Sequence, residues 1–431
     1  MVGDPISILC TGDVHLGRHP TRIPSDLDGR QFSPNAVWQE IVETARRREI
    51  DLVALTGDVV DRENRYFEAY GDIEEGIKQL AAANIPTVAV AGNHDYDVFP
   101  RLIDELDVDA LHLLGADGNW QRESIDLPGG RTIHLDGWSF PRSHVLESPL
   151  DTYDLEAAEE PTLGLLHADV NTQASEYAPV DLGSLLETDV DGWLLGHIHR
   201  DQVHSESDPL VLYPGSPQPL DPGERAGHGP WLLEIDERGS IAHEQLPLSS
   251  LRYDRLEIDV SGITDPKALP SVIREQLEAE FGNAATGLLE LLLVRLTLTG
   301  RTEAHSKIHE QTETIVTDLG MKVGGTTVRI ESIEVDTQPA IDLESLADGD
   351  SPAAYLADLL LSLDEGDDEA YEDVLEAAFN AMREAHQAST YRELRQENFI
   401  ESPTREDAID AVRAQARLLL DELQSQREGM Q

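Results

Sequence analysis

Five short polar motifs, each directly after an apolar run, contain the residues of this sequence best suited to metal chemistry. Together they supply two Asp, one Asn and four His as ligands, with one further His. Phosphoester hydrolysis at two ions about 3.5–4 Å apart requires a bridging carboxylate and a mixed oxygen and nitrogen ligand set. The motifs are Asp13-Val14-His15, Gly57-Asp58-Val59-Val60-Asp61-Arg62, Gly92-Asn93-His94-Asp95, His167 and Gly196-His197-Ile198-His199.

Each motif taken singly has an ordinary explanation. Gly57-Asp58 is typical of a turn, and His167 alone is typical of a buried, hydrogen-bonded histidine. A single Asp-X-His is expected to occur by chance. All five in order, each after a predicted strand, favour a two-metal hydrolytic site. Imidazole together with carboxylate suits Mn, Fe or Zn better than Ca or Mg.

The apolar runs before the motifs predict the frame that positions them. They have the length and composition of buried strands, whereas the segments between them show a helical pattern. Each motif follows the C-terminal end of a strand, the edge at which open α/β sheets place their binding crevices. The expected fold class is therefore α/β, built from layers of strands and helices. The predicted strands are Ile6–Cys10, Leu52–Leu55, Thr87–Val90, Thr162–Leu166 and Trp193–Leu195.

Two amphipathic helices are predicted between the first three strands, over residues 36–48 and 66–83. In the first helix, one apolar face would point inward while three consecutive arginines face water. The inward residues are Ile41, Val42 and Ala45, and the outward residues are Arg46, Arg47 and Arg48. Two more strand-like pieces, 211–213 and 231–235, follow the last motif.

The order of predicted elements divides the chain into three domains. Residues 1–250 hold all the motifs, and residues 251–340 have a β-α-β-α-β order, with helices near 268–280 and 305–319. Residues 341–431 are helical and acidic, with capping signals at Ser351 before Pro352 and at Thr404 with Asp407. The last helix either packs within the chain or docks on a partner. Its apolar residues are Ile409, Val412, Ala416, Leu419 and Leu423.

The charge of the chain is strongly unbalanced, with 84 acids against 32 bases and a formal net charge of −52. Such a charge makes a compact state repel itself at low salt. An acidic disordered protein would explain the composition, but the regular apolar runs argue against disorder. A folded protein from a high-salt cytoplasm is the preferred interpretation, because the Debye length falls to about 3 Å at 1 M salt.

Other features of the composition indicate the cellular compartment of the protein. The single cysteine, Cys10, excludes an intrachain disulfide and is expected to be a small core residue. Stretches of 18 apolar residues, the length of a membrane-spanning helix, are absent. The apolar run 6–10 is too short for a signal peptide. We therefore expect a cytoplasmic protein without a membrane partner.

The five motifs together resemble those of the calcineurin-like metallophosphoesterases. The resemblance implies a four-layer α/β sandwich, followed here by a small α/β capping domain and C-terminal helices. It implies that Asp58 bridges the two ions, that His94 is the general acid, and that Asp61 orients His94. It makes Arg62 and Arg18 candidate contacts to the substrate phosphate. The first ion would be held by Asp13, His15 and His199, and the second by Asn93, His167 and His197.

Further residues discriminate between branches of this superfamily. The segment 57–62 is also close to the serine/threonine phosphatase motif, but Glu63 and Asp95 depart from that pattern. The segment Tyr213–Leu220 resembles a signature of the SbcD-type DNA repair exonucleases, the meiotic-recombination nuclease family. One departure is Ala168-Asp169 after His167, where many relatives have Gly.

The SbcD-type resemblance implies a nuclease with two Mn²⁺ ions, for which Fe, Zn or Mg are alternatives. It would cut double-stranded ends as an exonuclease and single-stranded or hairpin DNA as an endonuclease, in DNA double-strand break repair. The resemblance also implies a homodimer that acts with an SbcC-type coiled-coil ATPase. Because this sequence lacks a Gly-X4-Gly-Lys phosphate loop, ATP hydrolysis would have to come from that partner. Arg18, Arg22 and Arg30 either line the DNA cleft or are scattered on the surface.

Two other functions stay open on the sequence. A metal-dependent phosphatase acting on phosphoproteins or small phosphoesters would use the same ligands. A DNA-end tether with a vestigial site would keep the fold without the metals.

Overall fold

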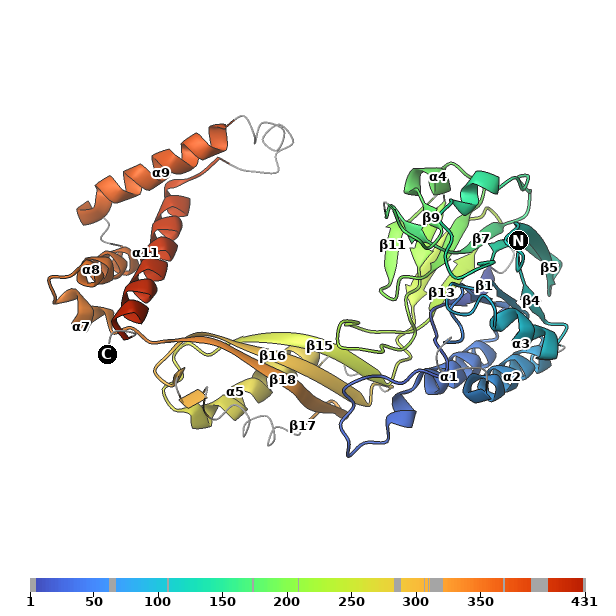
Figure 1. The fold of residues 1–431 in the computed structure, drawn as a ribbon, viewed down its shortest axis with the longest axis horizontal. Coiled ribbons are helices and arrows are strands. Elements are labelled where there is room, and N and C mark those ends of the chain that lie inside the picture. Colours follow the sequence, from blue (N-terminus) through green and yellow to red (C-terminus); the bar gives the residue numbers. More distant parts are fainter. Residues whose placement is uncertain are drawn as a thin grey trace. The chain divides into compact units, whose positions relative to one another are not determined.

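The computed structural model describes residues 5–61, 67–106, 108–172, 174–207, 209–282, 288–305, 307–308, 310, 321–366, 369–388 and 402–428. The chain forms two compact units (Figure 1). The first comprises Met1–Asp259, Asp265–Thr299 and Lys307–Asp336, and the second comprises Val260–Thr264, Gly300–Ser306 and Thr337–Gln431. The predicted boundary at residue 250 falls inside the first unit, and the division into three domains stays a prediction.

The first sheet of unit 1 carries three of the five motifs. Its strand order is β14-β13-β1-β2-β3-β4, and β1 to β4 are parallel while β13 and β14 are antiparallel. Parallel neighbours place their C-terminal ends at one edge of the sheet. The strands are β1 (Ile6–Thr11), β2 (Leu52–Leu55), β3 (Thr87–Ala89), β4 (Leu111–Leu113), β13 (Trp231–Ile235) and β14 (Ile241–Gln245).

The second sheet carries the other two motifs. Its strand order is β11-β12-β10-β7-β6-β5, and its central strands β12, β10, β7 and β6 are parallel. The strands are β5 (Gln121–Leu127), β6 (Arg131–Trp138), β7 (Thr162–His167), β10 (Gly192–Gly196), β11 (Gln202–Ser205) and β12 (Leu210–Tyr213). A separate parallel pair, β8 (Asp169–Val170) and β9 (Pro179–Val180), follows β7.

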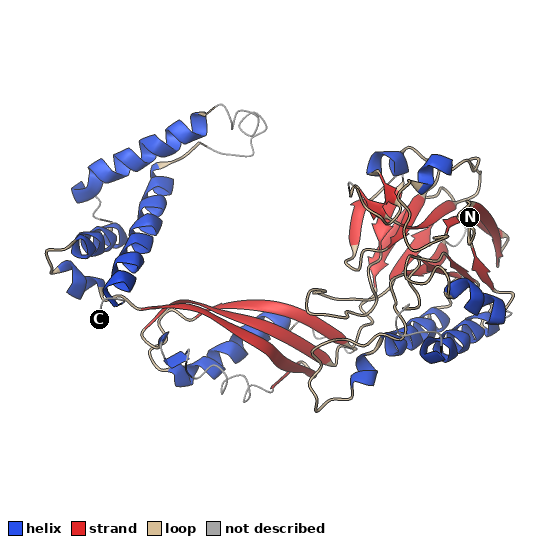
Figure 2. Ribbon diagram, viewed as in Figure 1, coloured by secondary structure: helices blue, strands red, loops and turns tan. Residues whose placement is uncertain are grey.

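Alternating side chains of the strands fill the spaces between four layers. In β1, Ile8 and Cys10 belong to the core between the two sheets, whereas Leu9 belongs to the core under the helices. Trp193 and Leu195 of β10 face the opposite side, where α4 (Leu182–Leu186) contributes Leu185. This period of two is the one a strand buried on both faces requires. The predicted four-layer α/β sandwich is confirmed, with helices outside the sheets (Figure 2).

The helices on the first sheet follow the predicted pattern. They are α1 (Pro34–Arg47), α2 (Phe67–Ala82) and α3 (Phe99–Leu106). Ser33 caps α1 by accepting a hydrogen bond from the amide of Ala36, and Pro34 occupies the first turn. Ile41, Val42 and Ala45 are buried and Arg46, Arg47 and Arg48 are exposed, as predicted.

A third sheet, most of which belongs to unit 1, has the strand order β15-β16-β18-β17. Its elements are β15 (Leu251–Asp259), α5 (Leu269–Phe281), β16 (Leu291–Thr302), β17 (Met321–Val323) and β18 (Thr326–Pro339). The predicted strands and the first predicted helix are therefore present. The second predicted helix, near 305–319, lies mostly outside the described residues.

Unit 2 contains the C-terminal helices, α7 (Leu343–Ala347), α8 (Pro352–Glu365), α9 (Glu372–Gln387) and α11 (Arg405–Glu428). Ser351 caps α8, and Thr404 and Asp407 form a reciprocal capping pair at α11, as predicted. In α11, Val412 and Ala416 are buried together with Leu420, so the α11 face packs within the unit.

The prediction that Leu419 lies on the buried face of α11 is wrong. Leu419 is 50% exposed, because the helical period of 3.6 places Leu420 rather than Leu419 one turn beyond Ala416. None of the described helices combines the length and apolar character that crossing a membrane requires.

Candidate metal centre

The strand ends of both sheets deliver the predicted ligands to one place. Asp13 and His15 follow β1, and the chain there continues beside the loop after β2. The amide of Asp13 donates to the carbonyl of Gly57 and the amide of His15 to that of Asp58. His167 is the last residue of β7. The remaining four ligands follow β2, β3 or β10, and they are Asp58, Asn93, His197 and His199.

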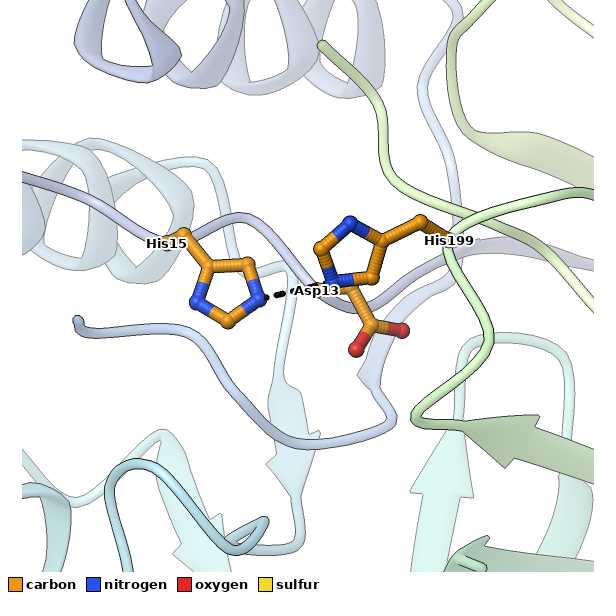
Figure 3. Close-up of side chains that lie close together, drawn as sticks. All are labelled: Asp13, His15 and His199. Atoms are coloured by element: carbon orange, nitrogen blue, oxygen red, sulfur yellow. Dashed lines mark hydrogen bonds between the residues drawn. The ribbon is translucent and has the colours of Figure 1, made fainter. Parts of the chain in front are cut away.

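The first cluster consists of Asp13, His15 and His199 (Figure 3). One ligand atom from each lies within 4.8 Å of the others. His15 Nε2 is 3.1 Å from His199 Nε2, and both carboxylate oxygens of Asp13 accept the amide of His197 at 3.1 Å. The resemblance predicts these three residues as the ligands of the first ion.

The second cluster forms around the amide of Asn93. Asn93 Oδ1 is 3.0 Å from His167 Nε2 and 3.2 Å from His197 Nδ1. Asp58 lies between the clusters, with Oδ2 3.3 Å from His167 Nε2 and 4.0 Å from His15 Nε2. The structure therefore brings all seven predicted ligands together, with Asp58 in the position of a bridge.

The hydrogen bonds at Nδ1 of His199 and His167 determine which ring nitrogen of each residue can bind a cation. His199 Nδ1 lies 2.7 Å from Glu224 Oε1, and His167 Nδ1 lies 3.0 Å from the carbonyl oxygen of Thr56. Because both oxygens accept hydrogen bonds, each neutral ring carries its proton on Nδ1 and presents a free electron pair on Nε2. These inward nitrogens, with the carboxylate and amide oxygens, form a donor set that fits divalent transition metals.

The electrostatics of the buried ligands are consistent with a cation site. Burial opposes ionisation of Asp58, but the nearby rings of His167, His15 and His94 hold its pKa well below the usual range. Burial lowers the pKa of His167, but the Asp58 carboxylate outweighs it and raises this pKa to about 9. Without metal, positive charge is thus favoured beside Asp58, and a metal ion would displace that proton.

The backbone at four ligands has the left-handed conformation that few side chains adopt. Asp13, His15 and Asp58 have φ of 50° and His197 has φ of 100°. These angles turn the chain sharply after each strand and aim the side chains at a common point.

His94 lies beside the two clusters. Its ring meets the ring of His15 edge to face, with centroids 5.1 Å apart at 87°, and its amide donates to Asp58 Oδ1 at 2.8 Å. Burial lowers the pKa of His94, while the carboxylates of Asp58 and Asp61 oppose that shift. The ring is only partly buried, so a substrate can reach it.

Asp61 lies close to His94, as the resemblance implies, but also contacts two other residues. Its Oδ2 is 3.6 Å from His15 Nδ1 and 3.5 Å from Arg18 Nε. Asp61, His15 and His94 have side-chain atoms within 4.8 Å of one another. Arg62, the other predicted phosphate contact, lies outside the described residues.

Only one of the three arginines after the first motif contacts the site within the described part of the chain. That residue is Arg18, through Asp61. Arg22 pairs with Glu331 at 3.6 Å, and Arg30 pairs with Asp28 at 2.8 Å. Both side chains are largely exposed, so their place in a DNA cleft or on the open surface stays a prediction.

Residues 6–201 match the model of the calcineurin-like phosphoesterases. These residues are therefore similar to a calcineurin-like metallophosphoesterase domain. The family indicates a metal-dependent hydrolase, and the two ligand clusters lie within or next to this segment. Residues 253–338 match the middle domain of the metallophosphoesterase YhaO, so the third sheet has a counterpart there.

Relatives of known name are similar at low identity. The uncharacterized metallophosphoesterase YhaO of Bacillus subtilis is 24% identical over 63% of this chain and 67% of its own length. The DNA double-strand break repair protein Mre11 of Methanopyrus kandleri is 22% identical over 58% of this chain and 58% of its own length. Among solved structures, calcineurin-like phosphoesterase YfkN from Bacillus subtilis aligns with 64% of this chain and 98% of its own, at 14% identity and a TM-score of 0.36.

The phosphoesterase domain contains supporting residues that the sequence did not reveal. Asp95 is fully buried and accepts hydrogen bonds from the amides of Gly92, Val59 and Val60. Burial and the Asp58 charge raise the pKa of Asp95 to about 7. Its place directly after His94 was the available signal, but nothing in the sequence indicated that it joins two motif loops.

The ligand loops of the phosphoesterase domain pack so closely that glycine is required at Gly92. A Cβ at this position would lie 2.2 Å from Asp58 Oδ1, inside the ligand sphere. Gly92 therefore allows the loop after β3 to approach the bridging carboxylate, a close approach that a side chain would block.

Proposed function

We propose that this chain is the nuclease subunit of a DNA double-strand break repair complex. It would hydrolyse phosphodiesters with two Mn²⁺ ions, as an exonuclease on double-stranded ends and an endonuclease on single-stranded or hairpin DNA. The supporting observation is the pair of ligand clusters that share Asp58 in a chain similar to an Mre11 protein. That similarity covers 271 residues and so extends beyond the segment 6–201.

The residues of the site have separate tasks in this proposal. The two clusters would hold the ions, which would supply a nucleophilic hydroxide and neutralise the phosphoryl oxygens. His94 is held at the edge of the clusters by the hydrogen bond from its backbone amide to Asp58 Oδ1, and its partly buried ring packs against the ring of His15. It protonates the leaving alkoxide, and its imidazole suits that task near neutral pH. Asp61 keeps the neighbouring ring of His15 and the side chain of Arg18 in place.

Arg18 is the proposed phosphate contact of the described part of the chain. Its side chain is 39% exposed beside the buried Asp61, so the guanidinium reaches solvent at the entrance to the site. Such a charge provides local attraction for DNA even though the whole chain is strongly acidic.

The partners belong to the proposal as well. A homodimer with an SbcC-type coiled-coil ATPase would supply the ATP hydrolysis for which this chain has no phosphate loop. Exposed apolar residues of unit 2 offer a surface for such a partner, and they are Tyr355, Leu418 and Leu419.

A cleavage assay in molar KCl tests the proposal. End-labelled duplex and hairpin DNA would be incubated with Mn²⁺ and either the unaltered chain or His94→Gln. We expect Mn²⁺-dependent cleavage that falls by about 10²–10⁴-fold in the variant, because a general acid contributes that much. No cleavage by the unaltered chain, or full activity of the variant, contradicts the proposal.

The same assay addresses the alternative of a metal-dependent phosphatase. Rapid hydrolysis of a phosphopeptide or a small phosphomonoester, together with intact DNA, would replace the nuclease with that function. A tether with a vestigial site is tested by metal analysis, because it would not bind two ions per chain.

A further inference from the structure

Two carboxylates outside the predicted ligand set contact the outer nitrogens of two ligand histidines. Glu224 contacts His199, a predicted ligand of the first ion, and Asp169 contacts His197, a predicted ligand of the second. Neither residue belongs to the five motifs. Each carboxylate therefore contacts a histidine that is a predicted ligand of a different ion.

Glu224 is fixed at both of its oxygens. Oε1 is 2.7 Å from His199 Nδ1, and Oε2 accepts the amide of Leu220 at 2.7 Å. The side chain is 16% exposed, so water competes little for these bonds. A carboxylate held at both ends fixes the plane of the His199 ring and keeps its proton on Nδ1. The opposite nitrogen then faces His15 with its electron pair free.

Asp169 has the corresponding position beside His197, with a longer contact. Oδ1 is 3.5 Å from His197 Nε2, and the hydroxyl of Ser175 donates to Oδ2. The amide of Asp169 donates to the carbonyl of Tyr177 at 3.1 Å, so β8 fixes its backbone. His197 then presents Nδ1 toward Asn93.

We propose that Glu224 and Asp169 are positioning residues that set the affinities of the two metal sites separately. Glu224 acts on the Asp13, His15 and His199 site through His199. Asp169 acts on the site of Asn93, His167 and His197 through His197. The inference rests on the two-metal site of the proposed function, but not on DNA as the substrate.

The metal affinities of the two sites are expected to change by different factors when the two carboxylates are removed. The first has the charged ligand Asp13 and a 2.7 Å carboxylate contact behind His199, whereas the second has the neutral amide of Asn93 and a 3.5 Å contact. A charge-assisted hydrogen bond weakens with distance, so the loss of Glu224 should matter more than the loss of Asp169. Removal of an outer partner of a metal ligand costs about 10–100-fold in metal affinity.

The experiment measures Mn²⁺ binding to the full chain after EDTA treatment, in molar KCl, by calorimetry and electron paramagnetic resonance. We expect Glu224→Ala to weaken one binding step by about 10–100-fold and Asp169→Ala to weaken the other step by a smaller factor. Glu224→Gln should lose less than Glu224→Ala, because its amide oxygen still accepts from His199 Nδ1. Circular dichroism of the metal-free variants should show that each is folded, so that a weaker binding step does not reflect unfolding.

Asp221→Ala is the matched control in the same loop. Asp221 Oδ1 accepts the amide of Gly223 at 2.7 Å, and none of its described contacts reaches a ligand histidine. This control should bind both ions with unaltered affinity. A double-variant cycle adds a sharper test. The effect of Glu224→Ala on Mn²⁺ affinity should vanish in a His199→Ala background. The effect of Asp169→Ala on Mn²⁺ affinity should persist in that background.

Three outcomes overturn the inference. They are unaltered binding in Glu224→Ala, equal weakening of both steps by Glu224→Ala, and an undiminished Glu224 effect in the His199→Ala background. Failure of the proposed function looks different, because the unaltered chain would then bind two Mn²⁺ ions without cutting DNA.

Discussion

His15 Nε2 and His199 Nε2 lie 3.1 Å apart, and each ring comes from the end of a strand in a different sheet. Two unprotonated nitrogens at this distance repel each other, so without metal one of them must carry a proton. A cation removes that conflict, because both electron pairs then point at positive charge. Metal binding should therefore join the two sheets at their C-terminal edges.

Metal removal should destabilise the fold. A ligand that binds only the native state adds about 2.7 kcal/mol at a concentration 100 times its Kd. We expect Mn²⁺ added to the EDTA-treated protein to raise the free energy of unfolding by about that amount, as measured by urea denaturation in molar KCl. Ca²⁺ provides the control, since it prefers all-oxygen ligand sets and should stabilise much less.

Gly92→Ala should disrupt the bridge region. The added Cβ would meet Asp58 Oδ1 at 2.2 Å, and forcing a methyl group into a packed site costs about 1–3 kcal/mol. We expect lower stability and loss of Mn²⁺ binding, measured by denaturation and metal analysis. Gly71→Ala in α2 is the control, because its Cβ would have open space and should stabilise the helix by about 0.5–1 kcal/mol. Equal behaviour of both variants would contradict the packing argument.

Arg18→Gln should weaken binding of DNA more than it slows the chemical step. Loss of one phosphate contact raises KM and reduces the salt dependence of binding by about one ion. Steady-state cleavage at several KCl concentrations measures both quantities. Arg46→Gln is the matched control, because Arg46 pairs with Glu43 on the exposed side of α1 and should leave KM unaltered. A lower kcat with unaltered KM would place Arg18 in the chemistry instead.

The net charge of −52 predicts a salt-dependent fold. The Debye length falls from about 10 Å at 0.1 M to about 3 Å at 1 M, which screens the repulsion among carboxylates. We expect the free energy of unfolding to rise between these concentrations of KCl, followed by circular dichroism with metal removed. A stability that is flat or falls with salt would reject the high-salt interpretation.

His228 should make the stability pH-dependent. Burial lowers the pKa of His228, although Glu224 and Asp201 oppose the shift, and Nδ1 lies 2.8 Å from the carbonyl of Ser216. Because the unfolded chain protonates first, this contribution is complete above the unfolded pKa of 6.5 and is lost as pH falls toward the folded pKa.

His228→Gln should reduce the slope of stability against pH below 6.5 by at most about 1.4 kcal/mol per pH unit, the value for one proton. Denaturant titrations at fixed KCl from pH 5 to 7.5 would measure the slope. An unaltered slope in the variant would show that His228 does not titrate in this range.

The sequence predicted the strands and ligands well because both depend on local signals. Buried strands such as Leu52–Leu55 are continuous apolar runs, and the ligands follow them within a few residues. Parallel pairing then brings separate motifs together without further information. The same reasoning missed the hairpin of β5 and β6, whose turn at Gly129 and Gly130 is a recognisable signal between less apolar strands.

Supporting contacts could not be predicted because they join residues far apart along the chain. Glu224 lies 25 residues beyond His199, and Thr56 lies 111 residues before His167. A carboxylate or a carbonyl at such a distance has no spacing rule that links it to a ring. Leu419 shows a second reason why a prediction fails. Neighbouring positions on a helix face different directions, so a shift of one position separates the buried Leu420 from the exposed Leu419.

The left-handed backbone at Asp13, His15, Asp58 and His197 has an evolutionary consequence. Each such residue costs about 1–2 kcal/mol, in a fold whose total stability is on the order of 5–15 kcal/mol. Glycine would relieve that strain at any of the four positions. A lineage that no longer needed phosphoester hydrolysis would therefore gain stability by losing its ligands, and the site would erode quickly.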